Sequence, residues 1–264
     1  MSVTISTLQK KKQSGEKITM LTAYDYPSAK LLDQAGIDII LIGDSLGNVL
    51  LGYNNTIPVT LDEMLHHTKA VARGVQNALI VTDLPFLSYQ VSTEDTIKNA
   101  GKVIKEGMAN AVKLEGATPK IIESIKALVE IGIPVMGHIG FTPQSVNQLG
   151  GYKIQGKEEV AAEKLIEQAK LLEKTGVFSI ELEMVPAKLA KEITTKAAVP
   201  TIGIGAGRDC DGQVLVLHDL LGLSEKSPKF VKKYAELNKE ISKAINNFKE
   251  DVEGSKFPDT KYSF

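Results

Sequence analysis

The sequence predicts an α/β fold, a (β/α)8 TIM barrel in which eight parallel strands alternate with helices around a closed sheet. Three observations lead to this prediction. Short, near-continuous apolar runs rich in β-branched residues recur along the 264-residue chain, as expected for parallel strands buried on both faces. Stretches with helical periodicity separate most of these runs. No shift in composition interrupts the alternation, which indicates one closed set of repeats.

Eight apolar runs are the predicted strands: 17–25, 37–45, 78–86, 111–117, 133–140, 177–186, 199–207 and 213–219. The clearest predicted helices between them are 61–74, 94–106, 119–131, 158–175 and 187–197. Several helices end in a glycine just before the next strand, at Gly36, Gly132 and Gly176, where a left-handed cap is needed. Only about five residues separate the last two runs, too few for a full helix, so the last repeat must be abbreviated.

Two further helices are predicted outside the repeats, an extra N-terminal helix at 1–15 and a lysine-rich closing helix at 228–251. A C-terminal tail at 254–264 follows. We expect the whole chain, 1–264, to form a single barrel domain. A doubly wound open sheet is the competing architecture for the same alternation of strands and helices.

The composition is that of an ordinary globular protein, with 43% hydrophobic residues, 24% charged residues and a net charge of -1. This balance lacks the basic surplus of nucleic-acid-binding proteins. The single cysteine, Cys210, excludes an internal disulfide and fits a reducing compartment. No apolar segment is typical of a signal peptide or a membrane span, so a cytoplasmic location is expected.

Ionisable side chains stand at the predicted carboxyl ends of seven of the eight strands, where barrel enzymes carry their active sites. Four or more carboxylates at one mouth repel one another unless cations compensate. Lys113 supplies one cation, and a hard metal ion such as magnesium, held by few carboxylates and water, would supply the rest. The residues are Asp25, Asp44 with Ser45, Asp83, Lys113 with Glu115, His138, Glu183, and His218 with Asp219.

One of these residues, and several other polar residues and glycines of the chain, also have a plain structural explanation. Asp44, taken alone, is equally typical of a turn or a helix cap. His66 and His67 point apart on a predicted helix and cannot chelate one metal ion, so a structural role is expected. Cys210 has no adjacent base in the sequence. The glycines of GIGAG at 203–207 either cradle an anion or permit a tight turn.

The chain resembles the ketopantoate hydroxymethyltransferase family in five stretches: TAYDYPSAKLLDQAGID, LIGDSLGNV, VKLEGA, GHIGFTPQSVNQLGGYKIQGK and GIGAGRDCDGQVLVLHD. They match in order from about Thr4 to Leu223. The resemblance implies a barrel of the phosphoenolpyruvate/pyruvate type that assembles as a homodecamer, a pentamer of dimers. It also implies Mg2+-dependent transfer of a hydroxymethyl group from methylenetetrahydrofolate to 3-methyl-2-oxobutanoate, in pantothenate and coenzyme A biosynthesis.

The resemblance also implies roles for individual residues. Asp44 and Asp83 are direct metal ligands, and Glu115 reaches the metal through a bound water. The substrate is contacted by Asp44, Ser45, Asp83, Lys113 and His138, and Glu183 is the base that removes the C3 proton. Departures from the family pattern fall at 48–57, at 208–211 and in the tail, so the folate contacts stay unassigned.

Two other functions fit the same barrel. A carbon–carbon lyase of the isocitrate lyase or phosphonopyruvate type shares the metal and the enolate, but its usual active-site cysteine loop is absent here. A non-catalytic ligand-binding barrel would have lost some of the charged strand ends. For Glu183 itself, the alternative to a base is a structural ion pair. Glu181, two residues earlier, shares its face of the strand, and both could pair with Lys113 or Arg208.

Overall fold

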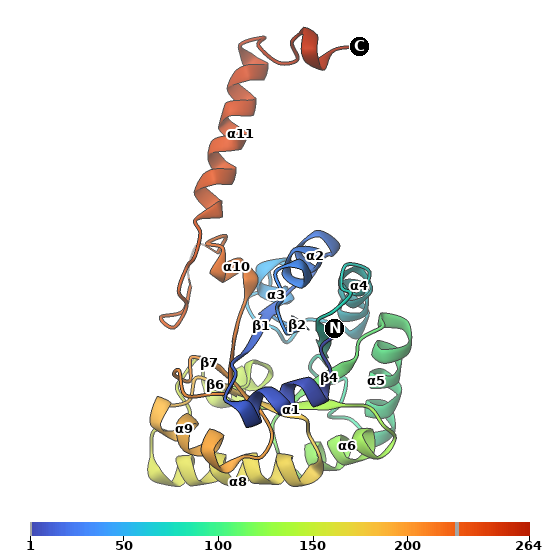
Figure 1. The fold of residues 1–264 in the computed structure, drawn as a ribbon, viewed down its shortest axis with the longest axis vertical. Helices are drawn as coiled ribbons and strands as arrows, with labels where there is room; N and C mark the ends of the chain where they lie inside the picture. Colours follow the sequence, from blue (N-terminus) through green and yellow to red (C-terminus); the bar gives the residue numbers. More distant parts are fainter. Residues whose placement is uncertain (1, 225–226) are drawn as a thin grey trace. The chain divides into compact units, whose positions relative to one another are not determined.

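The computed structural model describes residues 2–224 and 227–264, which form two compact units, Met1–Val216 and Leu217–Phe264. In the described part of the first unit, eight parallel strands close into a barrel in the order β1 to β8 (Figure 1). The predicted barrel is confirmed, and the open sheet is excluded. The strands are β1 Ile18–Thr22, β2 Ile39–Ile42, β3 Leu79–Asp83, β4 Ala111–Glu115, β5 Val135–Gly140, β6 Ser179–Glu183, β7 Thr201–Ile204 and β8 Gly212–Leu215.

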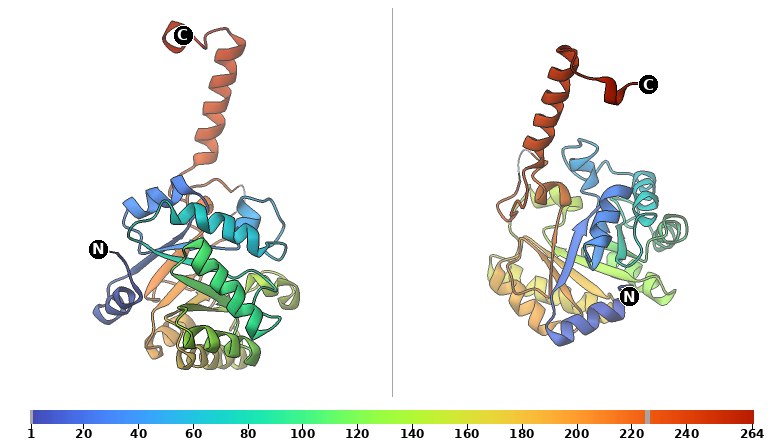
Figure 2. Two further views of the ribbon diagram at one scale, coloured as in Figure 1. Left: turned by 90° about the vertical axis from the view of Figure 1, so that its right-hand side faces the viewer. Right: turned by 45° about the horizontal axis from the view of Figure 1, so that its top comes forward.

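Helices lie around the outside of this sheet, as the two further views show (Figure 2). Those of the first unit are α1 Ile5–Ser14, α2 Tyr26–Gln34, α3 Leu46–Val49, α4 Leu61–Ala72, α5 Thr93–Gly107, α6 Pro119–Glu130, η1 Pro143–Ser145, α7 Val146–Leu149, α8 Glu159–Thr175 and α9 Ala187–Lys196. Between β7 and β8 the described residues 205–211 contain no helix, as predicted for an abbreviated last repeat.

The helix boundaries follow from local chemistry. At the start of α4, Thr60 Oγ1 accepts a hydrogen bond from the Glu63 N–H at 3.2 Å, and the Glu63 carboxylate accepts one from the Thr60 N–H at 2.7 Å. This reciprocal pair satisfies two donors that the first helical turn leaves free. Gly36, Gly132 and Gly176 have φ of 78°, 87° and 97°. They therefore take the left-handed conformation that the sequence predicts.

Helix α1 packs onto the amino-terminal end of the barrel. Its Leu8 is fully buried in a core cluster that contains residues from all eight described strands or their flanks, including Ile18, Ala111 and Val214. Lys11 and Lys12 follow on the same helix and form ion pairs at 2.7 Å with Asp38 and Asp211 of the barrel. The extra N-terminal helix thus belongs to the barrel core.

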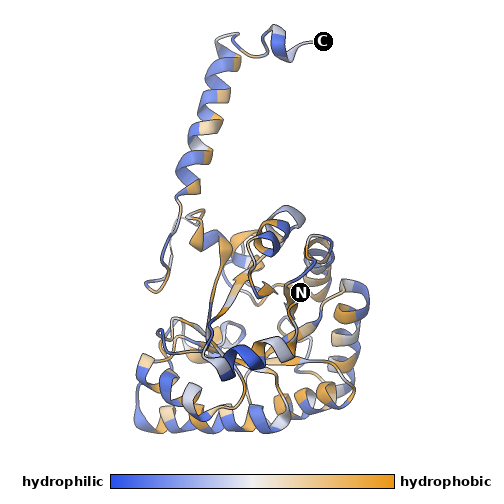
Figure 3. Ribbon diagram, in the orientation of Figure 1, coloured by the Kyte–Doolittle hydropathy of each residue, from blue (hydrophilic) through white to orange (hydrophobic). Residues whose placement is uncertain are grey.

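The hydropathy colouring shows apolar strands with helices that are polar on their outer faces (Figure 3).

We expect Leu8→Ala to lower the free energy of unfolding by about 2–5 kcal/mol, because it leaves a cavity between α1 and the strands. Urea unfolding followed by circular dichroism measures this as a lower midpoint with an unchanged slope. Lys10→Ala is the matched control on the exposed face of the same helix. Equal midpoints for the Leu8→Ala protein and this control would contradict the role of Leu8 in the core.

The second unit consists of α10 Leu217–Leu220, α11 Leu237–Glu253 and η2 Thr260–Tyr262. The closing helix predicted at 228–251 therefore begins later, at Leu237. The preceding segment is tied instead to the end of α10, because the backbone N–H groups of Tyr234 and Leu237 donate to the carbonyls of Leu220 and Leu221. In the described part of the chain, no helix is both long and apolar enough to cross a membrane.

Candidate active site

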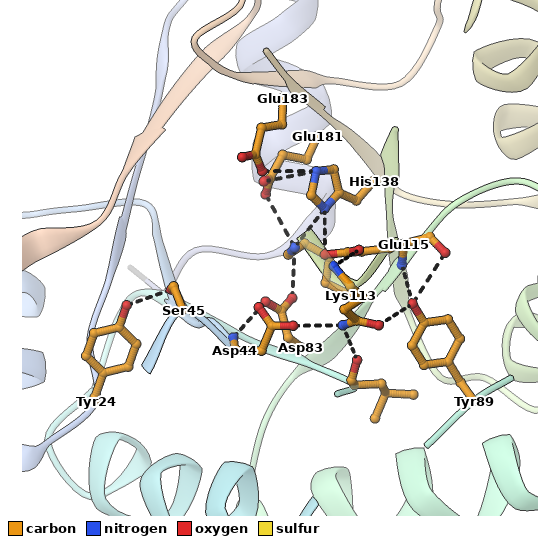
Figure 4. Close-up of polar contacts among 12 residues, drawn as sticks. Tyr24, Asp44, Ser45, Asp83, Tyr89, Lys113, Glu115, His138, Glu181 and Glu183 are labelled. Carbon is orange, nitrogen blue, oxygen red and sulfur yellow. Dashed lines mark hydrogen bonds and ion pairs between the residues drawn. The ribbon is translucent and has the colours of Figure 1, made fainter. Parts of the chain in front are cut away.

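The register of the sheet brings the predicted site residues to one end of the barrel (Figure 4). Asp83 of β3 is paired with Lys113 of β4. Glu115, two residues further along β4, is paired with His138 of β5, which is paired with Glu181 of β6. Paired residues of neighbouring strands point to the same face of a sheet. One register therefore makes five ionisable side chains converge.

Asp44 and Asp83 form the acidic end of this cluster. Asp83 Oδ2 accepts a hydrogen bond from the Asp44 N–H at 3.1 Å, and Asp83 Oδ1 lies 2.9 Å from Lys113 Nζ. Burial, reinforced by the charge of Asp83, raises the pKa of Asp44 to about 7. Burial opposes the charge of Lys113, but the carboxylates of Asp83 and Glu181 outweigh it and raise the pKa of that lysine. Lys113 is therefore an ammonium ion at neutral pH.

Gln144 and Tyr89 join the cluster without having been predicted. Gln144 Nε2 donates to Asp44 Oδ2 at 2.8 Å, and its backbone N–H donates to Glu115 Oε2 at 3.0 Å. The Tyr89 hydroxyl donates to Gln144 Oε1 at 2.8 Å. Gln144 thus holds two of the predicted metal ligands in place. Its one sequence signal is its position within the 137–157 segment that carries the family resemblance.

His138 lies between Lys113 and the two glutamates of β6. Its Nδ1 is 3.2 Å from Lys113 Nζ, and an ammonium group can only donate, so Nδ1 accepts. Burial and the charge of Lys113 hold the pKa of His138 well below its usual value, so the ring is neutral. Its single proton is therefore on Nε2, which faces Glu183 Oε2 at 3.3 Å and Glu181 Oε1 at 3.7 Å.

This assignment predicts that His138 carries its proton on Nε2, with Nδ1 unprotonated. Magic-angle-spinning NMR of protein labelled with 15N in its four histidines measures the protonation of each ring nitrogen. The His138 signals are those that disappear in a His138→Asn variant. Signals showing a proton on Nδ1 would mean that Lys113 does not hold the ring.

Glu181 and Glu183 extend from the same face of β6, as predicted. Glu181 is only 4% exposed, and its Oε2 lies 3.8 Å from Lys113 Nζ. Burial raises the pKa of Glu181 to about 7. Burial, together with the charge of Glu181, raises the pKa of Glu183 well above its usual value. Glu183 is thus more basic than an ordinary carboxylate and stands two residues nearer to the mouth than Glu181.

One group of side chains in the described part of the chain is compact enough to be considered for a metal ion, and a second group is considered for the chemistry of its ligands. His138 Nε2 and one oxygen each of Glu181 and Glu183 lie within 4.8 Å of one another. With the proton on Nε2, this group would have to lose that proton before His138 could ligate a cation. Asp44, Asp83 and Glu115 instead present only carboxylate oxygens, the ligands that Mg2+ prefers. Asp83 Oδ1 is buried and forms the 2.9 Å ion pair with Lys113 Nζ.

Ser45 follows Asp44 at the exit of β2, and its Oγ shares a hydrogen bond with the Tyr24 hydroxyl at 2.8 Å. A side chain at Gly43 would place its Cβ 2.7 Å from Ser45 Oγ and 3.5 Å from Asp83 Oδ2. The glycine therefore keeps open the space between the serine hydroxyl and the aspartate.

The remaining candidates have structural surroundings. Asp25 caps α2, with Oδ1 accepting from the Ser28 N–H at 2.8 Å. His67 contacts the backbone carbonyl of Tyr24 at 2.7 Å. Cys210 is buried, which raises its pKa, and a side chain at Gly203 would clash with its sulfur at 2.9 Å. Packing thus accounts for one glycine of GIGAG. His218 and Asp219 lie in α10 of the second unit.

The sequence profile described as ketopantoate hydroxymethyltransferase matches residues 2–260. The chain belongs to this family. A relative from Syntrophus aciditrophicus is 55% identical over 263 residues, which are 99% of this chain and 96% of that protein. A relative from Moorella thermoacetica is 57% identical over 263 residues, 99% and 97% of the two chains. Both are named 3-methyl-2-oxobutanoate hydroxymethyltransferase. The predicted family, and with it the class of hydroxymethyltransferase enzymes, is confirmed.

Solved structures resemble this member of the ketopantoate hydroxymethyltransferase family in fold alone. Phosphonopyruvate hydrolase has a TM-score of 0.64 at 12% identity, over 98% of this chain and 92% of that one. A 2,3-dimethylmalate lyase of the PEP mutase/isocitrate lyase superfamily has a TM-score of 0.62 at 15% identity, over 100% and 92%. These structures thus share the barrel fold with this chain, and family membership argues against the lyase and the non-catalytic barrel.

Proposed function

We propose that the protein transfers a hydroxymethyl group from methylenetetrahydrofolate to 3-methyl-2-oxobutanoate, giving ketopantoate for pantothenate biosynthesis. Family membership supports the reaction. The observation that supports the mechanism is the position of Glu183, a carboxyl group of raised pKa next to His138, in the same mouth as the acidic pair Asp44 and Asp83. One end of the mouth suits a metal ion, and the other suits a base.

Mg2+ fits the oxygen ligands at the first end, with Asp44 and Asp83 as direct ligands and Glu115 acting through water. When bound, the ion stabilises the negative charge that develops on the keto oxygen of a 2-oxo acid. Gln144 keeps Asp44 and Glu115 in position through its side chain and its backbone N–H. Ser45 and the ammonium group of Lys113 supply donors for the substrate carboxylate and oxo group.

Glu183 is the proposed base. Its raised pKa makes proton removal from C3 more favourable than for an ordinary carboxylate. The Nε2–H of His138 faces one Glu183 oxygen at 3.3 Å, which leaves the other oxygen for the substrate. After the C3 proton moves to Glu183, C3 forms a bond to the methylene carbon of the donor as the bond from that carbon to one of its two folate nitrogens breaks. Water then supplies the hydroxyl oxygen as the bond to the second folate nitrogen breaks, and the C3 proton and one proton of the water end on the two folate nitrogens.

A product assay tests the proposed function. The purified protein is incubated with 3-methyl-2-oxobutanoate, methylenetetrahydrofolate and Mg2+, and ketopantoate is measured by mass spectrometry. We expect ketopantoate to form and EDTA to stop its formation. The same assay with 2,3-dimethylmalate or phosphonopyruvate alone tests for lyase or hydrolase chemistry. Cleavage of either compound without ketopantoate formation would overturn the proposal.

The protein is also proposed to assemble as a homodecamer, a pentamer of dimers, on the basis of the family resemblance. Light scattering coupled to size-exclusion chromatography is expected to give about ten times the chain mass of 28.5 kDa. A monomer at micromolar concentration would contradict this assembly.

A further inference from the structure

The segment 141–158 connects β5 to α8 and therefore lies at the carboxyl end of the strands, the end that carries the candidate site. Both ends of this segment are fastened beside Glu183. The Phe141 N–H donates to the Glu183 carbonyl at 2.8 Å, and the Gln155 N–H donates to the Met184 carbonyl at 2.9 Å. The intervening residues are thus held next to the proposed base.

Tyr152 is the prominent side chain of this segment. It is 60% exposed, and its ring centroid lies 5.0 Å from that of Phe141 with a tilt of 34°. Phe141 itself is fully buried. One face of the Tyr152 ring therefore has a rigid aromatic support, while much of the ring stays accessible. The pKa of Tyr152 is raised by partial burial and then by the charges of Glu183 and Asp44, which places the ring within electrostatic reach of both.

The proposed reaction leaves this ring without a role. The 2-oxo acid is small and aliphatic, and the polar groups of the mouth account for its carboxylate and oxo group. The one-carbon donor carries a reduced pterin whose pyrimidine ring is flat and heteroaromatic, and its methylene carbon must meet C3 of the substrate beside Glu183. Tyr24 and Tyr89, the other tyrosines of the cluster, are almost completely buried and offer no face to a ligand.

We propose that Tyr152 is the stacking platform for the pterin ring of the one-carbon donor. The proposal rests on the proposed function and assigns the donor to the β5–α8 side of the mouth. A pterin stacked on a ring fixed beside Glu183 presents its attached methylene carbon on the side of C3 from which the proton leaves. Stacked aromatic pairs gain free energy beyond the burial of their surface. Together with the buried area, this predicts about a tenfold effect on donor affinity.

The test compares Tyr152→Ala, Tyr152→Phe and the wild type in three measurements. Tyr152→Ala is expected to raise the KM for methylenetetrahydrofolate about tenfold and to weaken the binding of tetrahydrofolate, measured by calorimetry, by a similar factor. Tyr152→Phe keeps the ring and is expected to match the wild type in both. Exchange of the substrate C3 proton with deuterated solvent needs no folate, and it is expected to persist in both variants.

Tyr26→Ala is the matched control, because Tyr26 is also exposed at the same end of the barrel, where it begins α2 after β1. The stacking proposal is overturned if Tyr152→Ala leaves KM and tetrahydrofolate binding unchanged, if Tyr152→Phe loses as much as Tyr152→Ala, or if Tyr26→Ala weakens donor binding in place of Tyr152→Ala. Failure of the proposed function has a different signature, since the wild type then forms no ketopantoate at all.

Discussion

Asp44→Ala is expected to lower magnesium-dependent turnover on the order of 10³-fold while the barrel stays folded, because it removes a direct ligand of the proposed metal. The fold should tolerate the change, since the carboxylate is buried next to Asp83 and its pKa of about 7 reflects an environment that opposes its charge. Gln144 keeps a second acceptor for its side-chain amide, the Leu84 carbonyl at 3.0 Å. Asp83→Ala should be equally inactive. This change also removes the partner of Lys113 in the 2.9 Å ion pair, so its effect is not confined to the metal ligand.

The measurements are Mg2+ binding by calorimetry and ketopantoate formation, with circular dichroism to verify folding. Asp25→Asn is the matched control, because this residue also follows a strand but caps α2, and asparagine keeps the cap. It should bind Mg2+ as the wild type does. If the Asp44→Ala protein binds Mg2+ and the 2-oxo acid with unchanged affinity, Asp44 is not a metal ligand.

Glu183→Gln is expected to lose exchange of the substrate C3 proton with deuterated solvent by about 10²–10⁴-fold, the range typical of a missing general base. Glutamine has the same shape and can accept a hydrogen bond from the His138 Nε2–H, so binding of Mg2+ and 2-oxo acid should persist. Proton NMR of the substrate in D2O follows the exchange directly. Because no folate is present, the experiment separates proton removal from the transfer step.

Glu181→Gln is the matched control on the same strand face. Glu181 contacts Lys113 and His138 but lies two residues deeper in the barrel than Glu183, so its variant should fold and keep the exchange. Exchange at the wild-type rate in Glu183→Gln would mean that another group removes the proton. His138 would be the next candidate, although its Nδ1 lone pair already accepts from Lys113.

The barrel could be predicted from the sequence because each strand is a short apolar run and most helices have a clear end signal. Even the missing helix before β8 follows from the spacing of Ile204 and Gly212. The closing helix was misplaced for a physical reason. Helical periodicity continues through 229–236, but the backbone of this segment bonds to the end of α10 instead.

The charged residues of the candidate site could be predicted from the sequence, but its neutral residues could not. Carboxylates, lysine and histidine at strand ends indicate chemistry by their residue type. Gln144 and Tyr89 carry no such signal, and only the folded chain brings them against Asp44 and Glu115. The tautomer of His138 was equally out of reach, because it depends on the 3.2 Å contact with Lys113, which is 25 positions away.

The pairing of β1 with β8 has a consequence for the way the protein is made. Met20 of β1 is in register with Val214 of β8. The first strand to leave the ribosome, β1, therefore lacks one of its two neighbouring strands until β8 is synthesised. At synthesis rates of about 5–20 residues per second, the intervening stretch of about 190 residues takes roughly 10–40 s. During that time Leu8 lacks part of its apolar cluster, and the edges of the nascent sheet are open to other chains. Newly made chains are therefore most vulnerable to aggregation before Leu215 emerges, and chaperone binding in this interval should favour the yield of folded protein.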